Sequence, residues 1–230
     1  MDKIEKLKEL KSLLDSGIID QNEFNQLKGE IIGGVAEKAS EKTEGIELEE
    51  IIIHGQTWAK SNLDVGTFQN GDFIFEAKSA ADWEAAGVQG RPAWCYYDND
   101  PVNGRKYGRL YNWYAVRDPR GLAPIGWHIP SDAEWTTVIE NLGGFGTAGT
   151  KLKSTSGWNE NGNGNNMSGF MAQPCGMRRD EGEFENIGNT GYWWSSDDPA
   201  YSVSIYCDMD FMGMSECLKA IGISVRCLRY

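Results

Sequence analysis

The chain has 230 residues, which is enough for one domain of ordinary size with its own core and a shorter appendage. Its 34 Asp and Glu outnumber its 22 Lys and Arg, and the net charge of −12 argues against broad binding of nucleic-acid phosphates. Nine Trp and 28 Gly indicate large rings joined by many turns, and therefore a loop-rich fold rather than a helical bundle.

No apolar run in the sequence approaches the roughly 18 residues that a membrane span requires. The first ten residues, "MDKIEKLKEL", contain no apolar region of the secretory type. As it stands, the sequence therefore predicts a cytoplasmic protein without a membrane span, and association with a cell surface or a phage is the alternative.

Residues 1–32 are predicted to form two short helices. Ile4, Leu7, Leu10 and Leu14 recur at helical spacing, and Gly17 is placed to end the first helix.

In the second predicted helix, Asp20 is the expected N-cap and Glu23 has the capping-box position. Phe24, Leu27 and Ile31 then form an apolar stripe. Two helices of about twelve residues are marginal alone in water, so the stripe requires a partner. We expect a homo-oligomer through residues 1–32; packing on the main domain or binding to another molecule are the alternatives.

The helical segment resembles the SHOCT family of short helical hairpins. The matching positions are Leu10, Leu13, Gly17, Ile19, Glu23, Phe24, Lys28 and Ile31. The resemblance implies oligomerisation or attachment rather than catalysis. Residues 33–45, "GGVAEKASEKTEG", are small and charged and predict a flexible linker.

Residues 46–230 are predicted to form an α+β domain. Turn signals such as "NGD" and "DPRG" arrive every eight to twelve residues. Two helices are expected at Ser79–Ala86 and Ser131–Leu142, and Glu134 has the capping-box position of the second. The expected strands are Glu50–His54, Tyr111–Val116, Tyr192–Ser195, Tyr201–Tyr206 and Ile223–Leu228.

Seven blocks of this domain resemble the Fibrobacter succinogenes major paralogous domain. They are "GQTWAKSNLDVGT", "RPAWCYYDND", "NGRKYGRLYNWYAV", "GLAPIGWHIPSDAEW", "LKSTSGWNENGNG", "GYWWSS" and "SVRCLR", and the resemblance covers 51–229. It implies a C-type-lectin-like fold: a twisted antiparallel sheet, two flanking helices, long loops and a last strand near Ser224–Leu228. The family is placed beside the formylglycine-generating enzymes.

The sequence departs from the family pattern between "WWSS" and "SVRC", and again at Gln173, Cys175 and Met177. Some proteins of this fold are targets of diversity-generating retroelements, which vary a C-terminal stretch on a constant scaffold. Residues 201–223 lie where such a variable region would lie. The resemblance therefore implies a variable ligand-binding surface there.

Val203, Ile205 and Ile223 are expected in the core. A group of five apolar residues, by contrast, follows "CDMD" in an expected loop and is interpreted as surface or groove; the five are Met212, Met214, Cys217, Leu218 and Ile221. The complete set of candidate ligand-binding residues is Tyr201, Ser202, Ser204, Tyr206, Asp208, Asp210, Met212, Met214, Glu216, Cys217, Leu218, Ala220, Ile221, Gln173 and Met177.

Two glycine-rich motifs resemble ligand loops only superficially. "GFGTAG", 144–149, follows a predicted helix rather than a strand, so we expect a turn and not a nucleotide site. "NENGNG", 159–164, begins like a calcium loop but has Phe170 where the bidentate Glu is required. A solvated loop is expected, and a weak calcium site with oxygens from Asn161, Asn163 and Asp208 is the alternative.

Five Cys and two His, His54 and His128, limit the chemistry available. His128 is expected to donate to a backbone carbonyl before the second helix of the domain. Cys217 lies ten residues before Cys227, unlike the closely spaced pair of the formylglycine-generating enzymes, and Cys207 with Cys217 is the other conceivable pair. Because Cys95 and Cys227 lie in family blocks, the resemblance allows a disulfide between them in an exported form.

The sequence therefore predicts a non-catalytic binding module without catalytic residues, cofactor or metal. Its expected ligand is a protein or a glycan at the C-terminal loops, and an oligomer would multiply weak sites into avidity. A redox or modifying enzyme of the formylglycine-generating type and a structural surface protein are the alternatives.

Overall fold

The computed structural model describes residues 3–16, 18, 24 and 46–230. The chain divides into two units, Met1–Gly45 and Ile46–Tyr230. In the first unit, α1 (Lys3–Asp15) confirms the first predicted helix. Leu10 on its apolar stripe is buried and Lys11 pairs with Asp15 at 2.7 Å. Gly17, all of the second predicted helix except Phe24, and the linker lie outside the described residues.

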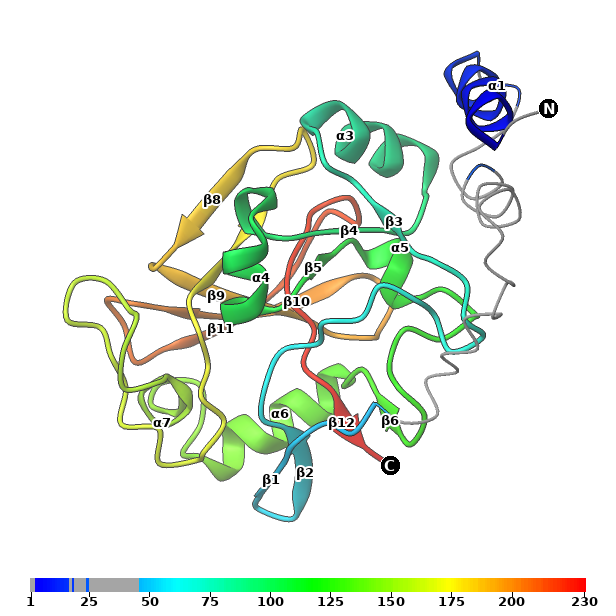
Figure 1. The fold of residues 1–230 in the computed structure, drawn as a ribbon. Helices are drawn as coiled ribbons and strands as arrows, with labels where there is room; N and C mark the ends of the chain where they lie inside the picture. The colour runs from blue at the N-terminus through cyan, green and yellow to red at the C-terminus, as the bar shows by residue number, and fades with distance from the viewer. Residues whose placement is uncertain (1–2, 17, 19–23, 25–45) are drawn as a thin grey trace. The chain divides into compact units, whose positions relative to one another are not determined.

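The second unit is an α+β domain, as predicted, with short strands, short helices and long connections (Figure 1). Its strands are β1 (Glu50–Ile53), β2 (Gln56–Ala59), β3 (Phe75–Glu76), β4 (Ala93–Cys95), β5 (Leu110–Tyr111), β6 (Trp127–His128), β7 (Cys175–Arg178), β8 (Phe184–Ile187), β9 (Thr190–Trp194), β10 (Tyr201–Tyr206), β11 (Met212–Glu216) and β12 (Leu228–Arg229). Its helices are α3 (Ala80–Gln89), the 3₁₀-helix η1 (Tyr97–Asn99), α4 (Pro101–Tyr107), α5 (Trp113–Val116), α6 (Asp132–Asn141) and α7 (Ala148–Leu152).

Four small sheets make up the β structure of this unit, with strand orders β1-β2-β12-β6, β11-β10-β9, β3-β4-β5 and β7-β8. Every strand pair is antiparallel except β3 with β4. In the first sheet, the last strand of the chain lies beside β2, so the two ends of the unit close the fold together.

The C-terminal segment connects the sheets to one another. Gly222 exchanges backbone hydrogen bonds with Arg178 of β7, and Ile223 does so with Tyr111 of β5. Ser224 then bridges to β9, because its amide donates to Tyr192 and its carbonyl accepts from Trp194. The predicted strand Ile223–Leu228 is therefore extended, but consecutive residues pair with different sheets.

The two predicted helices of the domain are confirmed, and the capping signals explain where they begin. The side chain of Ser79 accepts from the Asp82 amide and Asp82 returns the bond, so a capping box opens α3. Ser131 and Glu134 form the same box at α6. Gly90 ends α3 with a φ of 64°, a left-handed conformation that glycine adopts without strain.

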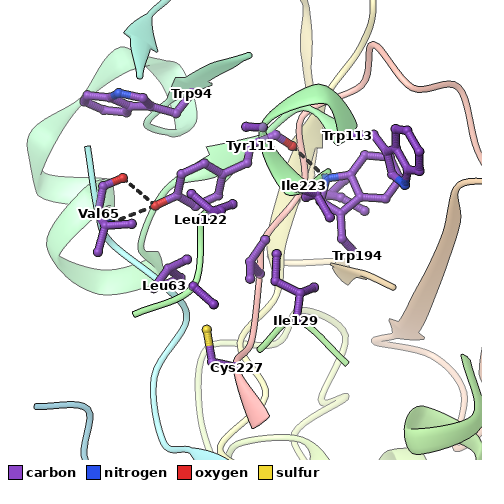
Figure 2. Packing of buried hydrophobic residues seen from close by; sticks show 14 of the residues in the cluster. Leu63, Val65, Trp94, Tyr111, Trp113, Leu122, Ile129, Trp194, Ile223 and Cys227 are labelled. Atoms are coloured by element: carbon purple, nitrogen blue, oxygen red, sulfur yellow. Dashed lines mark hydrogen bonds between the residues drawn. The ribbon is translucent and has the colours of Figure 1, made fainter. Parts of the chain in front are cut away.

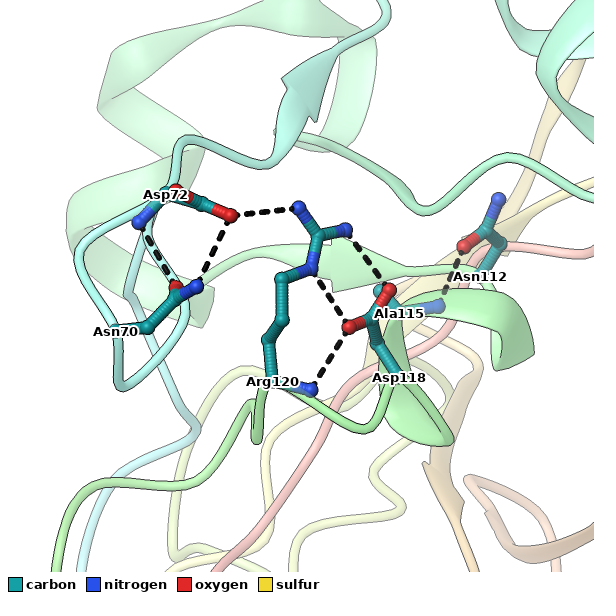
Figure 3. A network of polar contacts seen from close by, with 6 residues as sticks. All are labelled: Asn70, Asp72, Asn112, Ala115, Asp118 and Arg120. Carbon is teal, nitrogen blue, oxygen red and sulfur yellow. Dashed lines mark hydrogen bonds and ion pairs between the residues drawn. The ribbon is translucent and has the colours of Figure 1, made fainter.

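The predicted strand at Tyr111–Val116 is wrong beyond its first residue. β5 ends at Tyr111, and the Asn112 side chain accepts from the Ala115 amide at 3.0 Å to begin α5 (Figure 3). The short helices α4, α5 and α7 were not predicted, because segments of four to seven residues are too short to show a helical period.

Buried tryptophan and tyrosine side chains stabilise the core through hydrogen bonds as well as through packing. In the largest cluster, the Tyr111 hydroxyl accepts from the Val65 amide and donates to the Val65 carbonyl, both at 2.8 Å, and Trp194 Nε1 donates to the Tyr111 carbonyl at 2.7 Å (Figure 2). A second cluster contains Trp58, Trp135, Phe170 and Trp193, whose ring centroids lie 4.7 to 6.5 Å apart. These contacts fix the frame that carries β9, β10 and β11.

Candidate functional site

The sheet β9-β10-β11 has two different faces because side chains alternate along each strand. Val203 and Ile205 of β10 point into the second core cluster, where they pack with Trp193 and Met212. Val203, Ile205 and Ile223 are fully buried, as predicted. The alternate residues of β10, which include Ser204 and Tyr206, point to the opposite face.

Tyr192, Tyr206 and Phe211 lie around Ser204 and Gly213 on this opposite face, and we call these five residues the aromatic face. Ser204 pairs with Tyr192 on one side and with Gly213 on the other. A Cβ on Gly213 would lie 2.5 Å from Ser204 Oγ, 3.8 Å from Tyr206 Cε2 and 3.9 Å from Phe211 Cε1. The glycine therefore leaves the space into which the neighbouring rings and hydroxyls fit.

Hydrogen bonds order the hydroxyl groups of the aromatic face. Ser204 Oγ donates to the Tyr206 hydroxyl at 3.2 Å, and Asn186 Nδ2 of β8 donates to the Tyr192 hydroxyl at 3.2 Å. Burial raises the pKa of Tyr192, and a hydrogen bond with Thr190 opposes the shift. Tyr192 is therefore a neutral phenol at physiological pH, so its hydroxyl can both donate and accept.

The turn between β10 and β11 is held by a buried lysine. Lys153 is only 2% exposed, and its Nζ donates to the carbonyls of Tyr206 at 3.2 Å and Met209 at 3.0 Å. The Asp210 carbonyl accepts from the Gly149 amide, and the Asp210 side chain bonds Thr150. Except for the Asp210 carboxylate, these anchors engage the backbone of the turn.

Several predicted site residues are buried, which corrects the expectation of exposure. Met212 is 0% and Ile221 8% exposed, because Met212 belongs to strand β11 and packs in the second cluster, while Ile221 packs in the first. The segment that begins at Met212 is therefore a strand and not a loop. Ser202 and Ser204 are 2% and 3% exposed, and neighbouring side chains lie against both hydroxyls: Ser202 Oγ is 2.9 Å from Cys217 Sγ, and Ser204 Oγ donates to the Tyr206 hydroxyl.

The other candidates are at least partly accessible. Leu218 is 62% exposed, and Met214, Cys217 and Ala220 are half-buried. Asp208, Asp210 and Glu216 are exposed. Tyr201 is half-buried and has the alternation of Val203, so it points away from the aromatic face.

Of the three upstream residues at which the sequence departs from the family pattern, Gln173 and Cys175 do not join the aromatic face. A Cβ on Gly191, which shares the face of Trp193, would meet the Gln173 carbonyl at 2.6 Å, so Gln173 lies over the opposite side of β9. Cys175 is buried, with its thiol accepting from Asn62 at 3.1 Å. Met177 of β7 is half-buried and packs on the same core cluster as Tyr192 and Cys217.

Tyr192, Asn186 and Phe211 were not among the predicted site residues. Tyr192 lies in the block "GYWWSS", which was interpreted as scaffold, yet alternation along β9 places Tyr192 opposite to Trp193. That alternation is the signal that could have found Tyr192. Phe211 lies within the predicted variable stretch, and only the register Ile205–Met212 places it beside Tyr206.

A separate groove of about 760 Å³ lies between β1, the segment after β2, α4 and the loop before β7. Its lining includes Gln173, Asn62, Lys60, Lys106 and Asp64. Acidic and basic groups are mixed there, and Lys60 pairs with Glu49 at 3.4 Å. Gln173 is the only predicted site residue that lines this groove.

The five thiols are all free. Burial raises the pKa of both Cys95 and Cys227 to about 12, and they lie in different core clusters, so the disulfide that the resemblance allowed does not form in this structure. Cys207 and Cys217 lie at opposite ends of the β10–β11 hairpin and do not pair. Burial also raises the pKa of Cys175 and Cys207, which makes both weak nucleophiles.

His128 does not bond a backbone carbonyl, which corrects the prediction. Its Nε2 lies 2.8 Å from Glu134 Oε1, so the capping carboxylate of α6 is its partner. Within 3–16, 18, 24 and 46–230, no three His, Cys, Asp or Glu side chains gather as a metal-ligand set. In the "NENGNG" loop, the Asn163 side-chain oxygen accepts from the Trp158 amide at 3.0 Å, and the weak calcium site stays a prediction.

Comparison with known families fits this α+β domain of antiparallel sheets and long loops. Residues 51–229 match the model of the Fibrobacter succinogenes major domain, and residues 5–32 match the short C-terminal domain, SHOCT. The chain therefore belongs to the Fibrobacter succinogenes major domain family, and both resemblances found in the sequence are confirmed. No curated protein and no solved structure matches the chain. Among the described residues, no helix is long and apolar enough to span a membrane.

Proposed function

We propose that this protein is a non-catalytic binding module with a C-type-lectin-like fold, and that its ligand contacts the aromatic face. The observation that carries the proposal is that Tyr192, Tyr206 and Phe211 lie together on the side of the sheet opposite the second core cluster. Phe211 is 48% exposed and Tyr206 half-buried, while Tyr192 also packs against the first core cluster. Aromatic side chains with a hydroxyl dominate binding surfaces because they offer apolar area and a hydrogen bond at a small entropic cost.

The way in which the hairpin is held supports a displaying role. Lys153 bonds backbone carbonyls of the turn, the Phe145 carbonyl accepts from the Met212 amide, and the Cys217 amide donates to Ala200. Backbone anchors do not depend on which side chains the hairpin carries. Outward side chains between Ser204 and Leu218 can therefore change without loss of the turn.

The C-type-lectin-like fold is supported by the arrangement of the second unit. Its two longest helices, α3 and α6, accompany antiparallel strands, and the last strand, β12, pairs with β2 near the start of the domain. The residues from β6 to β9 include long connections without strands, where such folds carry their loops. These are the features that the family resemblance implies.

The state of the thiols supports a function without covalent chemistry. Four of the five cysteines have a raised pKa because they are buried, and a thiol must ionise to act as a nucleophile or a metal ligand. Cys217 is half-buried, and its Sγ lies 2.9 Å from Ser202 Oγ, with no cysteine partner.

The first unit supports a multivalent arrangement. α1 has 13 residues, which is marginal for an isolated helix, so the accessible part of its apolar stripe, the exposed Ile4 and the half-buried Leu7 and Leu14, favours association with other copies. An oligomer of binding domains converts weak single contacts into avidity. Sedimentation of the full chain tests this: an oligomer is expected, and a monomer at micromolar concentration would contradict it.

The experiment compares the full-length protein with Tyr206→Ala and Phe211→Ala on a glycan array and on a displayed library of random peptides. Loss of aromatic area at the centre of a contact costs about 1–3 kcal/mol, so binding should fall by roughly 5- to 150-fold in each variant. Phe73→Ala, at an exposed aromatic residue before β3, is the matched control and should bind like the wild type. Ligands that bind both aromatic variants unchanged would contradict the proposal.

Sequencing the same locus in sibling isolates tests the variable character of the face. Substitutions should concentrate at outward positions such as Tyr206, Asp208 and Phe211, and should spare Val203 and Ile205. An even spread of substitutions over the hairpin, or none, would contradict a diversified surface.

A further inference from the structure

We propose that the partner of the aromatic face is a basic protein surface, rich in Lys and Arg. This inference rests on the proposed function and adds the chemistry of the ligand. It follows from the charges of the two hairpins that flank the aromatic face, β7–β8 and β10–β11.

The β10–β11 hairpin presents only negative charge. Between Tyr201 and Cys217 it carries Asp208, Asp210 and Glu216 and neither Lys nor Arg, and all three acids are exposed. Glu216 pairs with Tyr201 and shares its side of the sheet, so the acids of this hairpin beside the aromatic face are Asp208 and Asp210 of the turn. Lys153 lies under the turn and faces Asp208 and Asp210, but at 2% exposure it cannot reach a partner's carboxylates. From outside, the hairpin is therefore an anionic surface.

The β7–β8 hairpin adds acids on the other side. It carries Asp180, Glu181, Glu183 and Glu185 against the single exposed cation Arg179. Arg179 is occupied, since it lies 3.4 Å from Glu181 and 3.3 Å from Glu185. Glu185 pairs with Met177 across the hairpin, and the next residue of β8, Asn186, bonds Tyr192, which places the C-terminal end of β8 beside the aromatic face. The tip, with Asp180, Glu181 and Glu183, lies against the start of α3, since a Cβ on Gly182 would be 2.5 Å from Ala80 Cα.

The acidic side chains beside the aromatic face favour some classes of ligand over others. A basic polypeptide gains attraction from carboxylates on both sides while its apolar groups cover the aromatic rings. An acidic protein or a nucleic acid is repelled by the same carboxylates, and a neutral glycan gains nothing from them. Charge complementarity around an aromatic centre therefore favours a basic protein.

The experiment selects a displayed library of random peptides on the full-length protein and counts the charges of the recovered peptides. The binding of individual peptides is then measured on Asp208→Asn/Glu183→Gln, which removes one exposed acid from each flanking hairpin, and on the control Glu84→Gln/Glu140→Gln, which changes the net charge equally through exposed acids of α3 and α6. Tyr206→Ala, with Phe211→Ala as a second variant, reports whether the aromatic face is used. The melting temperature of every variant is measured to identify loss of folding.

A basic partner predicts recovered peptides with excess Lys and Arg, bound roughly three- to ten-fold more weakly by Asp208→Asn/Glu183→Gln but not by the control pair. Binding should also weaken between about 50 and 500 mM NaCl. Neutral or acidic peptides that depend on Tyr206 would overturn this inference and leave the proposed function standing. Basic peptides that bind Tyr206→Ala and Phe211→Ala as tightly as the wild type would indicate non-specific charge attraction and would overturn the inference. Binding only on a glycan array, lost in Tyr206→Ala, would also overturn it and support carbohydrate at the same face. If no peptide or glycan binds more weakly to Tyr206→Ala or Phe211→Ala than to the wild type, the proposed function fails as well.

Discussion

Arg226 and Asn62 are joined inside the protein by two hydrogen bonds, because Nε and Nη2 of the guanidinium both donate to Asn62 Oδ1, at 3.0 and 2.8 Å. Trp193 Nε1 donates to the same oxygen at 2.8 Å. The Asn62 amide in turn donates to the Tyr107 carbonyl and to the Cys175 thiol. Asn62, which follows β2, thus connects α4 and β7 with β9 and the C-terminal segment.

Arg226 is a buried cation without an acidic partner among the residues that the structure describes. Its Nη1 donates to the carbonyls of Ala59, Lys60 and Phe170 at 3.0, 2.7 and 2.8 Å, and it is 1% exposed. Burial lowers the pKa of the guanidinium to about 10, which leaves it charged at neutral pH. Carbonyl dipoles therefore replace the water that the charge has lost.

Arg226→Lys should destabilise the protein by about 3 kcal/mol, because an ammonium cannot reproduce the planar fork and leaves buried carbonyls unpaired. Denaturation in urea gives the free energy of unfolding. Arg105→Lys, on the exposed end of α4, is the control and should stay within about 0.5 kcal/mol of wild type. A double-mutant cycle with Asn62→Ala should show coupling; additive effects would mean that the two side chains act independently.

Two apolar residues of the same hairpin region should respond oppositely to alanine. Met212 is 0% exposed in the second cluster, so Met212→Ala should lower the free energy of unfolding by about 2–4 kcal/mol. Leu218 is 62% exposed, and Leu218→Ala should change it by less than about 0.5 kcal/mol. Thermal unfolding of both variants checks this. Equal losses would show that Leu218 is packed, and that the accessible part of the candidate surface is smaller than described.

Lys153→Met should loosen the β10–β11 turn while the rest of the domain stays folded. The substitution removes the donor to the Tyr206 and Met209 carbonyls but keeps most of the apolar stem. Amide hydrogen exchange should therefore become faster in residues 207–212 than elsewhere. Lys78→Met, on an exposed side chain, is the control. Unchanged exchange at 207–212 would mean that the contacts with Gly149 and Phe145 suffice to hold the turn.

Acid should destabilise the protein through Asp118. Arg120 donates to Asp118 through Nε at 2.8 Å and Nη2 at 2.9 Å, and its Nη1 reaches Asp72 at 3.1 Å (Figure 3). The hydrogen bonds from Arg120 lower the pKa of Asp118 below its ordinary 3.8 despite partial burial. A depressed carboxylate pKa contributes stability that is complete above the unfolded value and is lost as the pH falls through the folded value.

The measurement is the urea midpoint between pH 6 and about pH 2 for wild type and Asp118→Asn. Wild type should lose stability as the pH falls below the ordinary Asp value, and Asp118→Asn should be less stable at pH 6 and show a flatter decline. Glu84→Gln, an exposed acid without such partners, should decline like the wild type. Parallel curves for wild type and Asp118→Asn would show that the Arg120–Asp118 ion pair contributes nothing to the pH dependence of stability.

The sequence predicted the elements whose signals are local. Ser79 and Ser131 each have an acid three residues later, and both helices begin there. The strand Tyr201–Tyr206 was predicted with its observed bounds. Tyr111–Val116 failed because a strand of two residues passes at Asn112 into a single helical turn, which no period of side chains reveals.

The candidate site was predicted less well because exposure depends on register. Met212 and Phe211 are neighbours in the sequence, yet one is in the core and the other on the aromatic face, and only the pairing of Ile205 with Met212 decides which. Tyr192 comes from a block that contains two core tryptophans, so composition suggested scaffold. Gln173 and Met177 are close in sequence, yet Gln173 lies over the Trp193 side of β9 and Met177 packs on the first core cluster, a difference that only the tertiary fold decides.

Hydrogen exchange of the full-length protein, with and without a saturating ligand recovered from the peptide library or the glycan array, locates the ligand most directly. If the aromatic face binds, protection should appear in the amides of β9, β10 and β11 around Tyr192, Tyr206 and Phe211. Protection confined to the groove lined by Asn62, Lys106 and Gln173, with no change in these three strands, would contradict the account.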